Sequence, residues 1–247
     1  MREHNLQSVS FPDPPETFHA RVCRTLADLP ERKEARHMKK PVKILLTAAA
    51  VIALLATAAF AAGRLADISS RTAAGTLTAL PSAGDAAQRL GVPVKLPAGF
   101  ANGYAFEQAN YVNNQEHDET GTVGRTWVSL SVQYGLNGSA VELNADSRTD
   151  LVGSDPKAER CERDGTALYY TAYTLKCVPE DYRMTAQDRQ DEADGVCEFS
   201  WGADETSVSQ VQSVSWADGG TAYVLTAIDA PLGRADLLGM AEQCLQR

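Results

Sequence analysis

Twenty consecutive residues without a charge, from 44 to 63, constrain this chain more than any other feature of its sequence. At about 1.5 Å of rise per residue they would form roughly 30 Å of helix, which matches the hydrocarbon core of a bilayer. The stretch is rich in alanine, and its larger apolar side chains sum to about −3 to −4 kcal/mol of insertion free energy. That is enough for insertion with little excess, so we predict a transmembrane helix at 44–63.

The charges on the two sides of this segment predict its orientation. Residues 1–43 carry nine Lys and Arg against six Asp and Glu, whereas residues 64–247 carry fourteen against twenty-six. Because cations next to a membrane span stay on the cytoplasmic side, we expect a single-pass protein of the cell membrane. It would have a cytoplasmic arm (1–43), a linker (64–81) and an acidic extracellular domain (82–247). Such a domain excludes nucleic acid as a partner, because affinity for nucleic acid comes from Lys and Arg.

A second interpretation of the apolar stretch starts translation at Met38. The chain would then begin with a short basic region, an apolar stretch and the small-residue pattern of residues 59–61, which is typical of a cleaved secretory signal. Read from Met1, about forty patterned residues precede the stretch, and cleaved signals rarely have so long a leader. We therefore favour a retained anchor over secretion.

The cytoplasmic arm contains one predicted amphipathic helix, which begins after the N-cap residue Asp13 and ends at Pro30. Its apolar face consists of Phe18, Val22, Leu26 and Leu29. A single short helix cannot bury such a face by itself. We therefore expect these four residues to bind a cytoplasmic protein partner, with the membrane surface or a solvated arm as the alternatives.

Strand and helix patterns fill the extracellular domain. The sharpest alternation lies at 127–134, where four apolar side chains alternate with Ser129, Ser131 and Gln133. Further strands are predicted at 104–112, 166–177, 196–201, 207–216 and 221–228, and helices at 82–90 and 232–245. Together these patterns predict an α+β domain, namely an antiparallel curved sheet of about seven strands with helices on one face.

The extracellular domain contains four cysteines, for which three pairings are possible: Cys161, Cys177, Cys197 and Cys244. We favour a disulfide between Cys177 and Cys197, which would clamp the acidic loop between two strands, and buried free thiols are the alternative. The loop does not match a calcium-binding EF-hand loop, because Gln190 and Trp201 stand where carboxylates are required. We therefore expect a solvated acidic loop.

The sequence contains no motif for catalysis, for a cofactor or for a metal. A nucleophile elbow, a P-loop, a dinucleotide fingerprint and an H-E-x-x-H pattern are all missing from it. His117 is the one histidine of the extracellular domain, and it lies in a polar stretch (113–119) that we predict to be a loop, a weak support for a catalytic base. His19 and Cys23 in the arm are too few ligands for zinc. We predict a protein that is not an enzyme and holds no cofactor or metal.

Three stretches of the chain carry a resemblance to known proteins. They are residues 18–30 in the arm, residues 86–100 at the entry of the domain, and residues 215–241 at its end. They resemble Gram-positive membrane proteins of the anti-sigma-factor type, whose exported part is a domain of unknown function related in shape to periplasmic-sensor or lipoprotein-carrier half-barrels. The resemblance implies a sigma factor as the cytoplasmic partner. The zinc-binding anti-sigma module would need a second cysteine three residues after Cys23, and Leu26 stands there instead.

These observations lead to two functional hypotheses. The first is a membrane-anchored regulator whose extracellular domain senses or binds an unknown ligand and whose arm contacts a cytoplasmic partner, such as a sigma factor. The alternative is a tethered or secreted envelope domain that carries a lipid or a peptide on a concave, apolar side of its sheet.

Overall fold

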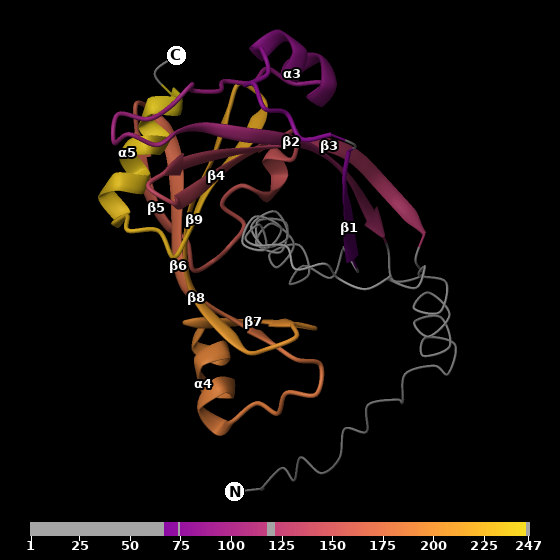
Figure 1. Ribbon diagram of the computed structural model, residues 1–247, viewed down its shortest axis with the longest axis vertical. Helices are drawn as coiled ribbons and strands as arrows, with labels where there is room; N and C mark the ends of the chain where they lie inside the picture. Colours follow the sequence, from indigo (N-terminus) through magenta and orange to yellow (C-terminus); the bar gives the residue numbers. More distant parts are fainter. Residues whose placement is uncertain (1–66, 74, 118–121, 246–247) are drawn as a thin grey trace, which may run out of the picture. The chain divides into compact units, whose positions relative to one another are not determined.

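The computed structural model describes residues 67–73, 75–117 and 122–245 (Figure 1). These residues belong to one compact unit, Val42–Arg247. The predicted arm with its contact residues Phe18, Val22, Leu26 and Leu29 lies outside the described residues, and so does the predicted span at 44–63. Within the described ranges, no helix is both long enough and apolar enough to cross a bilayer.

A single curled sheet of nine strands forms the body of the described part. Eight strands pair in the order β1-β2-β3-β4-β9-β8-β6-β5, and β7 pairs with β6. The β6–β7 pair is parallel and the other pairs of described strands are antiparallel. The strands are β1 (Asp67–Thr72), β2 (Ala105–His117), β3 (Val123–Leu136), β4 (Ser139–Asp146), β5 (Glu159–Arg163), β6 (Thr166–Val178), β7 (Cys197–Trp201), β8 (Ser207–Asp218) and β9 (Thr221–Ile228).

The expected antiparallel sheet of about seven strands with helices on one face is therefore wrong. The sheet is mixed because β7 returns parallel to β6, and a parallel return needs a long crossover, which residues 179–196 with helix α4 (Ala186–Asp194) provide. Helices α3 (Ala83–Leu90) and α5 (Arg234–Leu245) contact the central strands, whereas α4 contacts β7 at the far end of the long β6–β8 ribbon (Figure 1). The three helices do not form one layer over the sheet.

Apolar side chains on one face of the sheet form the core beneath α3 and α5. On β3, Leu130, Val132 and Tyr134 are fully buried, as their alternation predicts. Trp216 of β8 stacks on Tyr223 of β9 with ring centroids 5.2 Å apart. Removing such large side chains from water is the main force that holds the two helices on the sheet.

Local signals set the two ends of α3 as expected. The Ser82 hydroxyl accepts a hydrogen bond from the Asp85 backbone N–H at 3.1 Å, which caps the helix at its start. Gly91 ends the helix in the left-handed conformation, with φ of 74°. The predicted cap and stop are both confirmed.

The second face of the sheet is crossed by the connection from β4 to β5. Because β4 lies in the middle of the sheet and β5 at its edge, this connection must pass over β9, β8 and β6. It includes the short 3-10 helix η1 (Thr149–Leu151), which contacts β9. Gly153 then packs closely against the Tyr169 ring, because a Cβ atom at this position would lie 2.5 Å from the nearest ring atom. We call this side of the sheet the η1 face.

Candidate functional site

Polar side chains run in one row across the η1 face. The strand register places one residue from each of six neighbouring strands opposite the next: Gln108, Gln133, Glu142, Thr226, Ser213 and Thr171. At the two ends of this polar row, the Gln108 side-chain amide donates to Gln133 at 3.0 Å, and the hydroxyls of Thr171 and Ser213 lie 2.7 Å apart. The polar row therefore crosses six strands of the η1 face, which also carries the buried apolar side chains of Tyr173, Val211 and Val224.

Glu142 lies near the middle of the polar row and is only 4% exposed. Its Oε1 accepts hydrogen bonds from the Ser131 hydroxyl at 2.7 Å and from the Asn144 side-chain amide at 2.8 Å. Thr226, on the neighbouring strand, is also buried, and its hydroxyl has no hydrogen-bond partner among the described residues. Most of the hydrogen-bonding capacity around Glu142 is thus used within the fold itself.

The polarity of the η1 face bears on the carrier hypothesis. A lipid carrier needs an open apolar surface, because burial of the apolar chain supplies its affinity. Here the apolar face of the sheet is filled by α3, α5 and their core contacts, and the other face carries the polar row. The η1 face combines the polar row with buried apolar side chains such as Val211 and Val224, so the carrier hypothesis stays a prediction.

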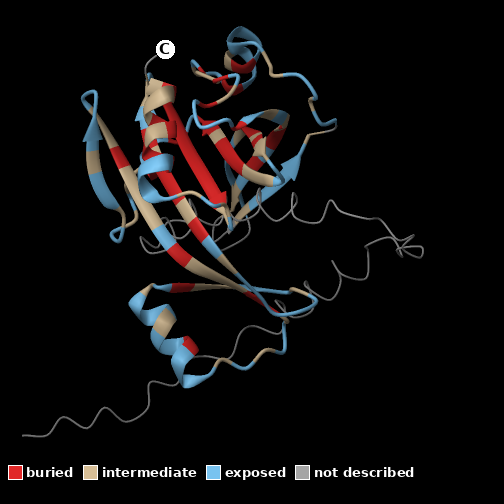
Figure 2. Cartoon of the chain, turned by 60° about the vertical axis from the view of Figure 1, so that its left-hand side comes forward, coloured by how far each residue is buried: buried red, intermediate tan, exposed pale blue. Residues whose placement is uncertain are grey.

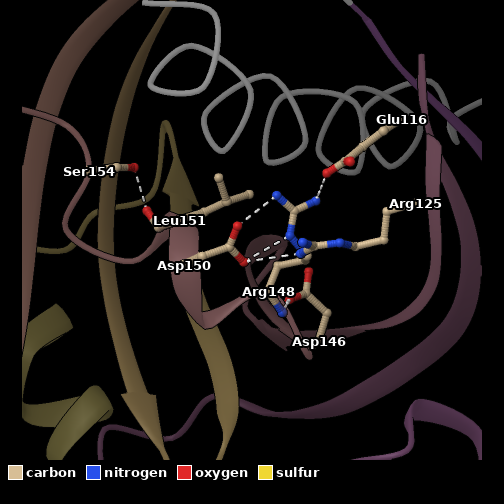
Figure 3. Close-up of polar contacts among 7 residues, drawn as sticks. All are labelled: Glu116, Arg125, Asp146, Arg148, Asp150, Leu151 and Ser154. Atoms are coloured by element: carbon tan, nitrogen blue, oxygen red, sulfur yellow. Dashed lines mark hydrogen bonds and ion pairs between the residues drawn. The ribbon is translucent and has the colours of Figure 1, made fainter. Parts of the chain in front are cut away.

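Arg148 is the centre of an ionic cluster beside the polar row, at the start of the β4–β5 connection (Figure 3). Its side chain is 4% exposed and forms an ion pair with Glu116 of β2. Its Nε and Nη2 atoms donate to the two carboxylate oxygens of Asp150 at 2.9 and 3.0 Å. The guanidinium also lies over the Trp127 ring, 4.8 Å from its centroid. These contacts tie the connection to β2 and β3.

Asp146 and Asp150 are placed on opposite sides of this cluster and titrate differently. Burial raises the pKa of Asp146 above its ordinary value, although its carboxylate accepts the Arg148 backbone N–H at 2.7 Å. The Trp127 indole N–H faces the same carboxylate without forming a hydrogen bond of normal geometry. By contrast, the hydrogen bonds from Arg148 lower the pKa of Asp150. The cluster pairs its one buried guanidinium with carboxylates from two different segments, which is the arrangement of a structural anchor.

Of the loop predicted at 113–119, residues 113–117 are strand, because they form the end of β2 and pair with β1. The His117 imidazole Nε2 lies 2.8 Å from the Ser69 hydroxyl on β1. A catalytic triad would need a carboxylate to orient the imidazole and an activated hydroxyl beside it. Ser69 is on the edge strand β1 and His117 is at the end of β2, and no carboxylate contact of His117 is found among the described residues.

A second polar cluster holds α4 against the sheet. We call α4, β7 and the paired ends of β6 and β8 (residues 174–210) the α4–β7 lobe. The Lys176 ammonium donates to Asp188 at 2.8 Å and to the Tyr182 hydroxyl at 2.7 Å, and Tyr182 donates to Asp188 at 2.8 Å. The ion pair raises the pKa of Lys176, and the same hydrogen bonds lower the pKa of Asp188. Asp188 is the one buried residue of α4, so a polar triangle rather than an apolar stripe attaches this helix.

Because α4 has no apolar face, large apolar side chains of the lobe stay exposed. Four large hydrophobic residues in the described part are exposed, and three of them lie in this lobe: Val196 (55%), Trp201 (49%) and Val208 (57%). Figure 2 shows α4 and β7 mostly in the colours of exposed and half-buried residues, whereas the strands beneath α5 are largely buried. The register places Phe199, Lys176 and Val208 side by side, with Trp201 two residues further along the same face of β7. Phe199, Trp201 and Val208 thus lie on one face of the lobe around Lys176, and we call these three apolar residues the apolar strip; Val196 alternates to the other face.

The predicted disulfide between Cys177 and Cys197 is not formed, since both residues are free cysteines. The β6–β7 register pairs Cys197 with Thr174, three residues before Cys177, so the two thiols point to opposite faces of the sheet. A bridge between them would require the strands to shift. Burial raises the pKa of the Cys197 thiol, as expected for a thiol that packs in the fold.

Sequence reasoning placed the acidic residues of the lobe in a loop and did not identify Arg148, Lys176 or Trp201 as notable. One signal was available: Thr185 and Asp188 form a capping box, a pattern that marks the start of a helix. The exposure of Trp201 on β7 could not be predicted from the sequence, because an aromatic residue in a strand is normally assigned to the core.

Comparison with known proteins assigns no family to this chain. No protein-family model matches the sequence, and neither a curated protein nor a solved structure shows significant similarity to it.

Proposed function

We propose that this chain is a membrane-anchored regulator of the anti-sigma type whose extracellular domain binds a protein partner through the α4–β7 lobe. The observation that carries this proposal is that Trp201 and Val208 are both exposed on the same face of one lobe. Exposed apolar side chains that gather on one surface mark interaction sites, and tryptophan is among the residues that contribute most binding energy at interfaces. The activity proposed is recognition and not catalysis.

The rest of the chain supports the other half of the proposal. The uncharged segment at 44–63 has the length of a membrane span, and six Lys and Arg lie between residues 32 and 43. The arm would then contact a cytoplasmic partner, such as a sigma factor, through Phe18, Val22, Leu26 and Leu29. Pull-down with the arm should recover this partner, and Val22→Asp or Leu26→Asp should abolish its recovery. Equal recovery by the wild type and both variants would contradict the arm's role.

Site-specific photo-crosslinking in the producing cells tests the extracellular half. A photoreactive amino acid in place of Trp201 should give a discrete crosslinked product with one protein partner. Val123 is the matched control, because it is 50% exposed and lies on β3, outside the lobe. The same product from both positions, or none from position 201, would rule out the lobe as the binding surface.

A further inference from the structure

We infer that the partner of the α4–β7 lobe is a cationic protein segment, which inserts apolar side chains between Trp201 and Val208 and places Lys or Arg against the acidic rim. This inference rests on the proposed function and names the chemistry of its partner. It combines two separate features of the lobe, namely an uncovered apolar strip and a strongly acidic surround.

The acidic surround is specific to this part of the chain. Residues 174–210 carry nine Asp and Glu against three Lys and Arg, a net charge of −6 within a chain whose net charge is −9. Lys176 is already neutralised by Asp188. The turn from β7 to β8, which begins directly after Trp201, carries the exposed residues Asp204 and Glu205. A partner must therefore pair with these carboxylates and cover the apolar side chains at the same time.

The apolar strip is held in place and so can serve as a preformed surface. The backbone N–H groups of Gly202 and Ala203 both donate to the Val178 carbonyl, at 2.9 and 3.1 Å, which fixes the chain just after Trp201. The Tyr182 ring lies 6.2 Å from the Trp201 ring and supports it from the loop before α4. An exposed indole face beside carboxylates binds a Lys or Arg side chain by cation–π attraction and ion pairing together.

Charge also excludes other occupants of the strip. A second copy of this chain would bring another lobe of charge −6 against the first, and like charges brought together oppose association. Nucleic acid and anionic lipid surfaces are repelled for the same reason. The negative charge of the lobe attracts a cationic segment before contact and stabilises it once bound. A cationic segment is therefore the occupant that the lobe favours.

A fluorescence titration tests this inference. The probe is a short synthetic peptide of Lys, Leu and Gly, added to the full chain in nanodiscs of neutral lipid, with empty nanodiscs as the blank. Trp201 is the most exposed of the three tryptophans, so we expect a blue shift of its emission on binding. Because Trp201→Ala removes this reporter, the variants are compared by the fluorescence anisotropy of a dye on the peptide. Trp201→Ala and Val208→Asn should each weaken binding by about tenfold or more, as for residues at the centre of an interface. Val123→Asn is the control for Val208→Asn and should leave binding unchanged.

Charge variants complete the test. The double variant Asp204→Asn with Glu205→Gln should weaken binding severalfold, whereas Glu162→Gln with Asp164→Asn removes the same charge at the opposite end of β6 and should have no effect. Binding should also weaken in about 0.5 M NaCl, where charges are screened within roughly 5 Å. Equal binding of a peptide with Glu in place of Lys, or no lobe-dependent binding, would overturn the inference. Crosslinking from position 201 to a non-cationic partner would overturn it as well, while leaving the proposed function intact.

Discussion

Arg148 shows how one residue can organise a surface that lies outside the apolar core. Its guanidinium joins β2, through Glu116, to the β4–β5 connection, through Asp150. Removing only the positive member of a buried cluster is costly, because the remaining carboxylates are left partly desolvated without a partner.

We therefore predict that Arg148→Met lowers the free energy of unfolding by about 2–4 kcal/mol, as measured by denaturant unfolding. Arg160→Met is the control, since that side chain is 58% exposed and pairs only with exposed Glu162. Its effect should stay within about 0.5 kcal/mol. Similar losses from both variants would contradict the anchoring role of Arg148.

Asp146 gives a prediction with a defined pH dependence. Burial raises the pKa of Asp146, so the folded state binds its proton more tightly than the unfolded chain. Stability is therefore lost as the pH rises from the ordinary Asp pKa, near 4, to the raised value. Asp146→Asn has no carboxyl group to titrate at this position and so does not lose this stability. The free energy of unfolding of the variant minus that of wild type should therefore be greater at pH 7 than at pH 3. Denaturant unfolding at both pH values measures this difference. A difference that is smaller at pH 7 than at pH 3, or an equal pH dependence in the exposed control Asp164→Asn, would contradict the role of Asp146.

At the scale of elements, α4 is the helix whose stability depends on a polar contact. Its sequence supplies a capping box but no apolar stripe, and its one buried residue is Asp188. Such a helix is expected to open locally before the sheet does, because few apolar contacts must be broken.

We predict that Asp188→Asn selectively exposes α4. Because Lys176 lowers the pKa of Asp188, the contribution of this contact is complete above the ordinary Asp pKa and is lost as the pH falls towards the lowered value. Hydrogen exchange at 186–194 should therefore speed up in wild type only under strong acid, and in Asp188→Asn already at pH 7. Amides of β9 should not change, and neither should α4 in the Glu192→Gln control. Uniform acceleration across the sheet would contradict an independent α4 unit.

At the scale of the whole molecule, the proposed anchor at 44–63 can be tested by its narrow energetic margin. Its insertion free energy is only about −3 to −4 kcal/mol, and each Arg at the centre of a span costs about 2.5 to 3.5 kcal/mol. Leu54→Arg with Leu55→Arg should therefore release the chain from the membrane fraction after an alkaline wash. Leu26→Asp lies in the arm and should leave the chain in that fraction. A wild-type chain that appears in the medium without residues 1–61 would favour the cleaved signal.

Several elements were predictable from sequence because their signals are local. The alternation at 127–134 determined which face of β3 carries the apolar core residues, although Ser129 and Ser131 on the other face are buried too, and Ser82 and Gly91 determined where α3 begins and ends. Strand β4 was not among the predicted strands, although it had comparable signals, since it alternates Val141, Leu143 and Ala145 with polar residues after the Asn137-Gly138 turn. These signals depend only on residues close together in the sequence, so they can be recognised without knowing the tertiary fold.

Contacts between distant segments decided what the sequence by itself could not. The edge strands β1 and β5 exist because they pair with β2 and β6, and β7 is parallel because α4 carries the chain back along the sheet. The same pairing brings six polar residues from six strands into one row and leaves Trp201 uncovered beside an acidic turn. Hydrogen bonds between strands and the covering of side chains depend on which segments meet in space, and that is a property of the tertiary fold.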